Sequence, residues 1–286
     1  MSDFIKQITE MDEPYLIAEI GINHNGDMNI AKKLIDATNA CGWHCAKFQK
    51  RNPDLCVPDH QKEIERDTPW GRMTYLDYKY RVEFDKKEYD TIKEYCLNKS
   101  LAWTVSVWDL DSLNFIINYD IPFIKIPSAH ITNKELLKEC SMSNIPLIIS
   151  TGMSNWDIVD AAVELIGKHT NDFMILHCNS TYPAPLNELN LNIIPIMKER
   201  YGCMVGYSGH EFNLEPAVIA VALGAQIIER HITLDHKMWG TDQSASLEVH
   251  AMDLLRKRLK DVKQILGGQD KIITESEKQV LKKLRG

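Results

Sequence analysis

Short apolar runs alternate with longer amphipathic segments along most of this chain. Eight of the short runs are rich in β-branched and other apolar residues and are bounded by polar or turn-forming residues, a pattern typical of strands. They cover residues 15–21, 45–50, 101–109, 123–128, 146–151, 173–180, 203–210 and 226–233. The pattern therefore predicts eight strands, most of them buried.

Several segments between these runs place their apolar residues on one face of a helix. The clearest cover residues 29–42, 84–100, 155–170, 214–225 and 246–268. In the first, Ile30, Leu34 and Ile35 share a face, and Gly42 ends the pattern. This alternation predicts an α/β protein with a (β/α)8 TIM barrel fold, and a doubly wound open sheet is the alternative.

Two segments depart from the alternation. Residues 51–83 form a long connection after the second strand, and such a connection in a compact domain is usually functional. It can also be an inserted hairpin or a surface excursion. Residues 268–286 begin at a Gly-Gly break and predict a short C-terminal helical tail. We therefore expect one barrel domain over residues 1–286, with these two additions.

Composition narrows the class of protein. The chain has 286 residues, 44% of them hydrophobic, and a formal net charge of -7. No run approaches the roughly 18 apolar residues of a membrane span, and the acidic N-terminus does not resemble a signal peptide. Seven cysteines without CxxC spacing favour a reduced, cytoplasmic compartment. The acidic balance argues against nucleic acid and membrane surfaces as partners. An anionic small-molecule substrate would need a local group of lysines.

Polar side chains gather where the predicted strands end. They are Glu19, Lys47, Gln49, Ser106, Lys125, Ser128, Ser150, Thr151, Ser180, Tyr182, Ser208, His210, Glu229 and His231. In a TIM barrel the functional site lies at this end of the strands. We therefore expect these side chains to surround one polar pocket.

Lysines and hydroxyl groups dominate this set. Lys47 and Lys125 end the second and fourth predicted strands, and Ser106, Ser128, Ser150 and Ser208 end neighbouring ones. Such a cup suits a small anion that carries a phosphate ester and a carboxylate. Alternatively, the lysines extend their charges to solvent along apolar stems.

Two histidines end the last two predicted strands. His210 and His231 would converge on the same pocket, where two imidazoles suit a divalent transition metal with open coordination positions. A hydrogen-bonding or core role for each histidine is the alternative.

The strand-end residues lie within longer motifs. These are IAEIGINHNGD at 17–27, AKFQK at 46–50, KIPS at 125–128, ISTGMS at 149–154, LHCNSTYPAP at 176–185, GYSGHE at 206–211, ERHITLD at 229–235, GTDQSASLE at 240–248 and TESEK at 274–278. In this order, over almost the whole chain, they resemble the sialic acid synthase family, the phosphoenolpyruvate-dependent synthases of nonulosonic acids.

The resemblance implies a TIM barrel that condenses phosphoenolpyruvate with an aldose of the N-acetylmannosamine type, giving a 3-deoxy-2-ulosonic acid and phosphate. Phosphoenolpyruvate would be held by Lys47, Lys125, Ser106, Ser128, Ser150, Ser180 and Ser208. The sugar would contact Gln49, Tyr182 and Asp242, and Glu19 and Tyr182 would belong to the catalytic group. His210 and His231 would bind Mn²⁺, with Mg²⁺ or Co²⁺ as alternatives. Members of the family also lead us to expect a homodimer.

Three features depart from the family pattern. His130 stands where the family commonly has Glu, and an imidazole there can also exchange protons or simply cap the next helix. Ser180 stands where Asn is frequent. The motifs end near Gly286, where most members continue into a small antifreeze-like domain.

The departures leave two alternative functions open. One is a synthase that acts on a phosphorylated sugar, as 3-deoxy-octulosonate-8-phosphate synthases do, with Arg51, Arg66 and Arg72 as candidate contacts for the distal phosphate. The other is a non-catalytic, sugar-binding paralogue.

Overall fold

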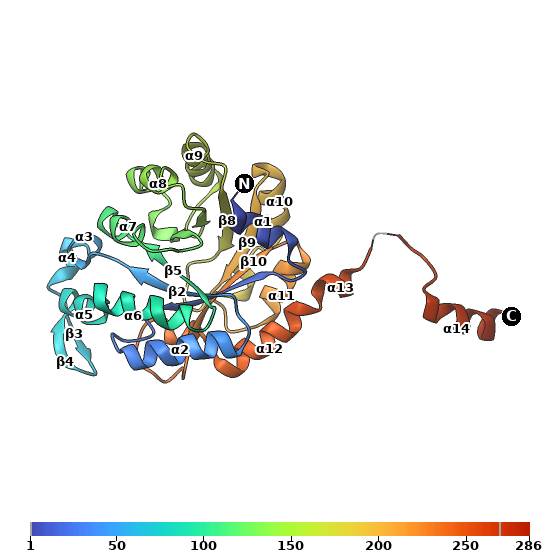
Figure 1. Cartoon of the computed structure of the whole chain (residues 1–286), viewed down its shortest axis with the longest axis horizontal. Helices are drawn as coiled ribbons and strands as arrows, with labels where there is room; N and C mark the ends of the chain where they lie inside the picture. Colours follow the sequence, from blue (N-terminus) through green and yellow to red (C-terminus); the bar gives the residue numbers. More distant parts are fainter. Residues whose placement is uncertain (1, 269) are drawn as a thin grey trace.

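A computed structural model describes residues 2–268 and 270–286 of the chain. At its centre is a closed barrel of eight parallel strands surrounded by helices (Figure 1). The strands are β1 (Tyr15–Gly21), β2 (Cys45–Lys50), β5 (Ala102–Val107), β6 (Ile124–Ile126), β7 (Leu147–Ser150), β8 (Phe173–Cys178), β9 (Met204–Gly209) and β10 (Ile227–Thr233). Strand β1 pairs with both β2 and β10, which closes the barrel. The predicted (β/α)8 barrel is confirmed, and the open sheet is excluded.

Helices cover the outside of the barrel. They are α2 (Met28–Ala40), α6 (Lys86–Leu97), α7 (Leu110–Ile116), α8 (Lys134–Ser141), α9 (Trp156–Gly167), α10 (Ile193–Tyr201), α11 (Glu215–Ala222), α12 (Val249–Lys260) and α13 (Val262–Leu266). The sequence pattern missed α7 and α10, whose seven and nine residues are too few to establish a clear helical period, and α8 is the helix expected after His130. A two-residue strand, β11 (Leu247–Glu248), pairs with the end of β10.

The barrel has two apolar cores because strand side chains alternate between its two faces. The outward residues pack against the helices. The inward residues form a smaller cluster that includes Ile17, Phe123 and Ile148. Helix α1 (Asp3–Glu10), which the sequence pattern also missed, joins this inner cluster through Phe4, Ile5 and Ile8. The N-terminal end of the barrel is therefore filled with apolar side chains.

The long connection at 51–83 is ordered. It contains α3 (Pro53–Cys56), α4 (Asp59–Lys62), the antiparallel hairpin of β3 (Glu65–Thr68) and β4 (Gly71–Thr74), and α5 (Tyr75–Val82). Its Tyr78 packs edge-on against Trp239 at 5.0 Å, and Trp70 does so at 5.6 Å. Aromatic residues of the connection therefore contact the chain's own barrel.

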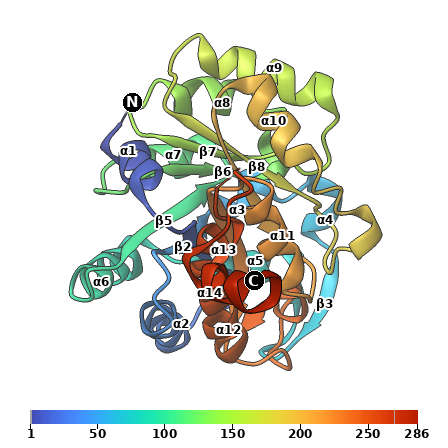
Figure 2. The same cartoon turned by 90° about the vertical axis from the view of Figure 1, so that its right-hand side faces the viewer.

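The C-terminal residues extend away from the barrel. Helix α14 (Glu275–Arg285) lies apart from the barrel helices in Figure 1 and therefore stands in front of the barrel in the perpendicular view of Figure 2. It lies within the residues expected to form the tail, and Ile272, Ile273 and Leu284 are exposed there. None of the helices in the described ranges is long and apolar enough to cross a membrane.

Candidate active site

The inward side chains change from apolar to polar toward the C-terminal ends of the strands. In β1, Ile17 belongs to the inner apolar cluster, and the next inward residue is Glu19. The same step leads from Phe123 to Lys125 and from Ile148 to Ser150. The alternation of strand side chains therefore places a polar layer directly on the apolar filling of the barrel.

A cavity of about 220 Å³ opens within this polar layer. It is lined by Glu19, Lys47, Gln49, Ser106, Trp108, Lys125, Pro127, Ser128, Ala129, Ser150, Met153, Ser180, Tyr182, Ser208, His210, Glu229 and His231. The structure thus brings together every residue that the sequence pointed to as a contact for phosphoenolpyruvate or metal. Asp242 lies just beyond the lining, 3.9 Å from Nδ1 of His231.

Buried ion pairs connect the two lysines of the cavity. Lys125 donates a hydrogen bond to Glu229 at 3.0 Å, and Ser208 donates to the same carboxylate oxygen at 3.0 Å. Lys47 lies 3.6 Å from the other oxygen of Glu229, contacts Glu19 and donates to Ser106 at 2.9 Å. The lysines are therefore not exposed snorkelling residues, since each is at most 2% exposed.

These contacts set the charges of the cavity. Burial opposes the charge of Lys47, but Glu19 and Glu229 outweigh it and raise the pKa of Lys47. Burial lowers the pKa of Lys125, and the attraction of Glu229 offsets this only in part. Burial also opposes ionisation of Glu229, but Lys125 and Lys47 outweigh it and lower the pKa of Glu229 to about 2. The barrel interior thus holds lysine ammonium groups and carboxylates that are paired with one another.

Glu229 was expected at the pocket, but its role between the two lysines was not predicted. The alternation of strand side chains accounts for its direction. Glu229 and His231 are two residues apart and both line the cavity, whereas Arg230 between them faces outward. Arg230 is fully buried and donates to Glu211 at 3.0 Å and to the Asn213 carbonyl at 3.1 Å. At the charged end of β10, Glu229 and His231 therefore face the cavity, and Arg230 packs on the outer face of the barrel.

His210 and Tyr182 form a second polar group in the cavity. The Asn179 carbonyl, 2.5 Å from Nδ1 of His210, can only accept, so this nitrogen carries the proton. Nε2 then accepts from the Tyr182 hydroxyl at 3.0 Å. Burial and the neighbouring His231 lower the pKa of His210 to about 3, and burial raises the pKa of Tyr182. A neutral imidazole and a protonated phenol therefore face each other at neutral pH.

His231 completes this group. Its ring lies 5.6 Å from the ring of His210 and 5.6 Å from that of Tyr182. Its Nδ1 is buried and makes no hydrogen bond within the described chain. A buried nitrogen without a partner is costly unless a ligand or water satisfies it.

A close approach of backbone and side chains joins three strands on the opposite side of the cavity. Ser128 accepts a hydrogen bond from the Gly152 amide at 3.0 Å. A Cβ atom added at Gly152 would lie 2.1 Å from the Ser180 hydroxyl and 2.9 Å from that of Ser128. Only glycine at this position therefore leaves room for both hydroxyl groups.

His130, the candidate for proton exchange in place of the family's Glu, is not one of the inward strand residues. Strand β6 ends at Ile126, and His130 lies in the following turn, with its ring edge-on to Trp108 at 5.2 Å. It is absent from the described residues that line the cavity. Burial lowers its pKa, and Arg51 lowers it further, while Asp109 acts in the opposite direction. Its catalytic role stays a prediction.

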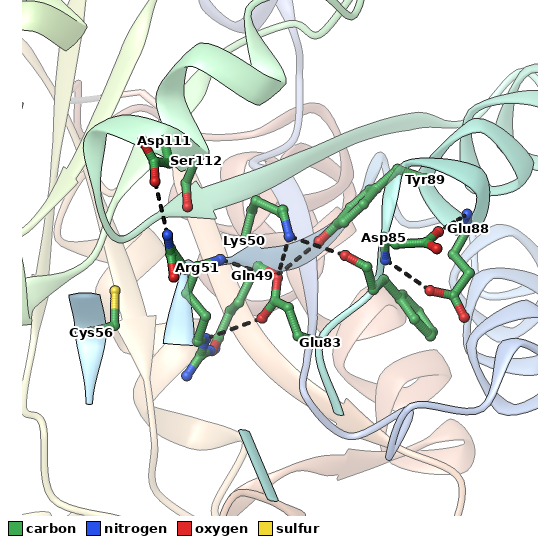
Figure 3. A network of polar contacts seen from close by, with 12 residues as sticks. Gln49, Lys50, Arg51, Cys56, Glu83, Asp85, Glu88, Tyr89, Asp111 and Ser112 are labelled. Carbon is green, nitrogen blue, oxygen red and sulfur yellow. Dashed lines mark hydrogen bonds and ion pairs between the residues drawn. The ribbon is translucent and has the colours of Figure 1, made fainter. Parts of the chain in front are cut away.

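The basic residues of the connection at 51–83, the candidate contacts for a distal phosphate, take different positions. Arg51 pairs with Glu83 and contacts the side chain of Gln49, a cavity residue (Figure 3). Arg72 is exposed and pairs with Glu65 at 2.7 Å. No sequence pattern pointed to Lys79, which is buried and lies over the rings of Tyr75 and Tyr78 in the same connection.

The fold and the cavity together define a TIM-barrel protein whose central cavity holds two buried lysines beside two histidines. A model of the NeuB family matches residues 34–271. The chain belongs to the NeuB family.

Characterised relatives match over most of the chain. The N-acetylneuraminate-9-phosphate synthase of Drosophila melanogaster is 37% identical, and the match covers 88% of this chain and 69% of that protein. The N,N'-diacetyllegionaminic acid synthase of Campylobacter jejuni is 33% identical, with 94% and 82% covered. The crystal structure of N-acetylneuraminic acid synthetase from Leptospira borgpetersenii in complex with citrate superposes with a TM-score of 0.85 and is 29% identical in sequence. The match covers 96% of this chain and 93% of that one.

Proposed function

We propose that this protein condenses phosphoenolpyruvate with an aldose of the N-acetylmannosamine type to give a nonulosonic acid and inorganic phosphate. One observation carries the proposal: two buried lysines and a set of hydroxyl groups lie beside His210, Tyr182 and His231 in one cavity. Phosphoenolpyruvate is a trianion at neutral pH and suits the lysine side of the cavity. The names of the relatives describe synthases of this class.

In the condensation, C3 of phosphoenolpyruvate forms a bond to the aldehyde carbon, and the aldehyde oxygen takes up a proton. Water adds to C2, the C2–O bond to phosphate breaks, and phosphate leaves as C2 becomes a ketone. We assign the binding of phosphoenolpyruvate to Lys47 and Lys125, with Ser106, Ser128, Ser150, Ser180 and Ser208. We assign the proton exchanges to Glu19, Tyr182 and His130, and the sugar contacts to Gln49, Tyr182 and Asp242.

We also propose that His210 and His231 hold a divalent metal ion. Nε2 of a neutral His210 and Nδ1 of His231, which makes no hydrogen bond within the described residues, fit this role, because metal ligation needs an unprotonated nitrogen. No group of three or more His, Cys, Asp or Glu side chains within residues 2–268 and 270–286 is arranged to hold an ion, so water or substrate would complete the coordination. Bound Mn²⁺, or alternatively Mg²⁺ or Co²⁺, supplies Lewis acidity toward the sugar aldehyde.

The test is release of inorganic phosphate from phosphoenolpyruvate, measured with Mn²⁺ across a panel of aldoses. We expect release only when an aldose is present, loss of release on chelation, and recovery on adding Mn²⁺. Full turnover by the chelated protein would refute the metal site. Binding of phosphoenolpyruvate without phosphate release for any aldose would refute the condensation and favour a non-catalytic paralogue.

Two further properties belong to the proposal. All seven cysteines are free thiols, which supports a reduced, cytoplasmic location. The resemblance to the family supports a homodimer. Small-angle scattering of the active protein tests the dimer, and a strictly monomeric active protein contradicts it.

The relatives differ in one chemical respect. The Drosophila protein is named for a product with a 9-phosphate, and the Campylobacter protein for a product without one. Condensation adds three carbons to the aldehyde end, so C6 of a six-carbon aldose becomes C9 of the product. The question for this chain is whether its aldose carries a phosphate at C6.

A further inference from the structure

Lys79 on α5 is an unusual residue for the interior of the molecule. It is only 9% exposed, and among the described residues no carboxylate or carbonyl oxygen forms an ion pair or hydrogen bond with its ammonium group. Its Nζ lies 5.1 Å from the ring centre of Tyr75 and 5.3 Å from that of Tyr78. Lysine is rarely buried without a partner of opposite charge, so this position calls for a functional explanation.

Other cations surround Lys79. Arg66 of the hairpin stacks on the same Tyr75 ring at 3.8 Å, and Arg51 stacks on Trp108 at 4.5 Å. Burial lowers the pKa of Lys79 to about 8, and Arg51 and Arg66 contribute to this shift. Asp242 and Glu83 act against it, but Glu83 is shared with Lys50 at 2.8 Å and Arg51 at 3.6 Å. The group of Arg51, Arg66 and Lys79, here called the mouth cations, thus has an excess of positive charge.

Two contacts connect the mouth cations to the cavity. Arg51 contacts Gln49 and stacks on Trp108, and both of these residues line the cavity. Asp242, whose charge acts to raise the pKa of Lys79, lies 3.9 Å from His231. Gln49 and Asp242 are two of the three residues assigned to the sugar. The mouth cations therefore lie beside sugar contacts of the cavity.

We propose that the mouth cations bind a phosphate monoester on the end of the aldose that lies farthest from its aldehyde. This inference rests on the proposed condensation, because the aldehyde must face phosphoenolpyruvate in the barrel while the far end of the sugar points to the mouth. A phosphate dianion accepts hydrogen bonds from several directions and matches arginine and lysine donors. The substrate class is thus an N-acetylhexosamine 6-phosphate.

The kinetic test compares N-acetylmannosamine 6-phosphate with N-acetylmannosamine in the wild type, Lys79→Met and Lys79→Arg. We expect the wild type to prefer the phosphorylated sugar in kcat/KM by about tenfold to a hundredfold, the range of one charge-assisted contact. Lys79→Met should reduce that preference by a similar factor, and Lys79→Arg should retain most of it. The matched control is Lys257→Met, which removes an exposed lysine on α12 and should keep the wild-type preference.

A binding test separates this inference from the proposed condensation. Reduced N-acetylmannosamine 6-phosphate has no aldehyde, so it can be titrated calorimetrically into the protein with phosphoenolpyruvate present. Binding that weakens at least tenfold in Lys79→Met but not in Lys257→Met supports the phosphate site, even if no aldose releases phosphate.

Three results would overturn the site. The first is that the wild type uses the unphosphorylated sugar equally well. The second is that a sugar with a carboxylate in place of the phosphate is a better substrate. The third is that Lys79→Met lowers kcat/KM equally for both sugars. In the last case Lys79 only supports the packing of α5, and thermal unfolding should then show the loss.

Discussion

Glu229→Gln is the substitution that most directly tests the charge balance of the cavity. The glutamine keeps the shape of the side chain but removes the charge that Lys125 meets at 3.0 Å and Lys47 at 3.6 Å. With an effective dielectric constant of about 20, each contact corresponds to a gross attraction of roughly 5 kcal/mol. Desolvation cancels much of this, and removing one member of a buried pair typically costs about 3–5 kcal/mol. We expect a loss of unfolding free energy in that range.

The same substitution should strengthen the binding of phosphoenolpyruvate. Glu229 is a buried anion that competes with the substrate for both lysines, so its removal leaves more positive charge for the ligand. We expect the Kd for phosphoenolpyruvate to fall about tenfold or more, since a charge-assisted contact contributes roughly 1.5–3 kcal/mol. Bound phosphoenolpyruvate should therefore restore much of the lost stability, because a ligand that binds only the folded state stabilises it.

Glu211→Gln provides the matched control. It also removes a buried carboxylate from an ion pair, the 3.0 Å contact with Arg230, but on the outer face of the barrel. We expect a similar loss of stability and no change in the Kd for phosphoenolpyruvate. Denaturant unfolding with and without the ligand, together with calorimetry, measures both quantities. If Glu229→Gln binds phosphoenolpyruvate no better than Glu211→Gln does, the two carboxylates are equivalent and the competition is wrong.

Three other substitutions give separate tests. Burial, with a smaller contribution from Arg51, lowers the pKa of His24 to about 3. In the unfolded chain this imidazole takes up its proton at about pH 6.5. The free energy of unfolding should therefore fall as the pH falls between 6.5 and 3. At pH 5 the loss is about 2 kcal/mol, and unfolding curves of His24→Phe should lack it, whereas those of a control variant at exposed His250 should keep it. Lys125→Met should weaken phosphoenolpyruvate binding at least tenfold by calorimetry, and unchanged affinity would contradict the anion site. His130→Ala should lower kcat far more than phosphoenolpyruvate affinity, and wild-type turnover and pH profile would reduce His130 to a structural residue.

The residues inside the barrel were the predictable part of the site. Their positions follow from two regularities, the alternation of strand side chains and the location of barrel sites at one end of the strands. Glu19, Lys47 and Lys125 could be placed on these grounds alone. Glu229 obeys the same alternation and was expected at the pocket, but its pairing with both lysines was not predicted.

The residues outside the strands could not be placed in this way. His130 was expected to follow directly from a strand over 123–128, but β6 ends at Ile126 and a tight turn follows. A turn has no side-chain period, so it does not fix the direction of the imidazole. Lys79 belongs to a helix whose burial depends on how the connection at 51–83 folds back onto Trp239. No local pattern in the sequence contains that information.

Any buried site for a trianion needs positive charges that stay stable before the substrate binds, and the ion pairs of this cavity provide that stability. Two lysines that are 1–2% exposed would repel each other and pay a large desolvation cost if they had no counter-charge before the substrate binds. Glu19 and Glu229 supply that counter-charge from neighbouring strands, so the barrel can fold with its site already formed. The cost is competition with the substrate, which the Glu229→Gln experiment measures. At the mouth, Lys79 lacks such a carboxylate partner among the described residues, and the same reasoning therefore assigns its counter-charge to the ligand.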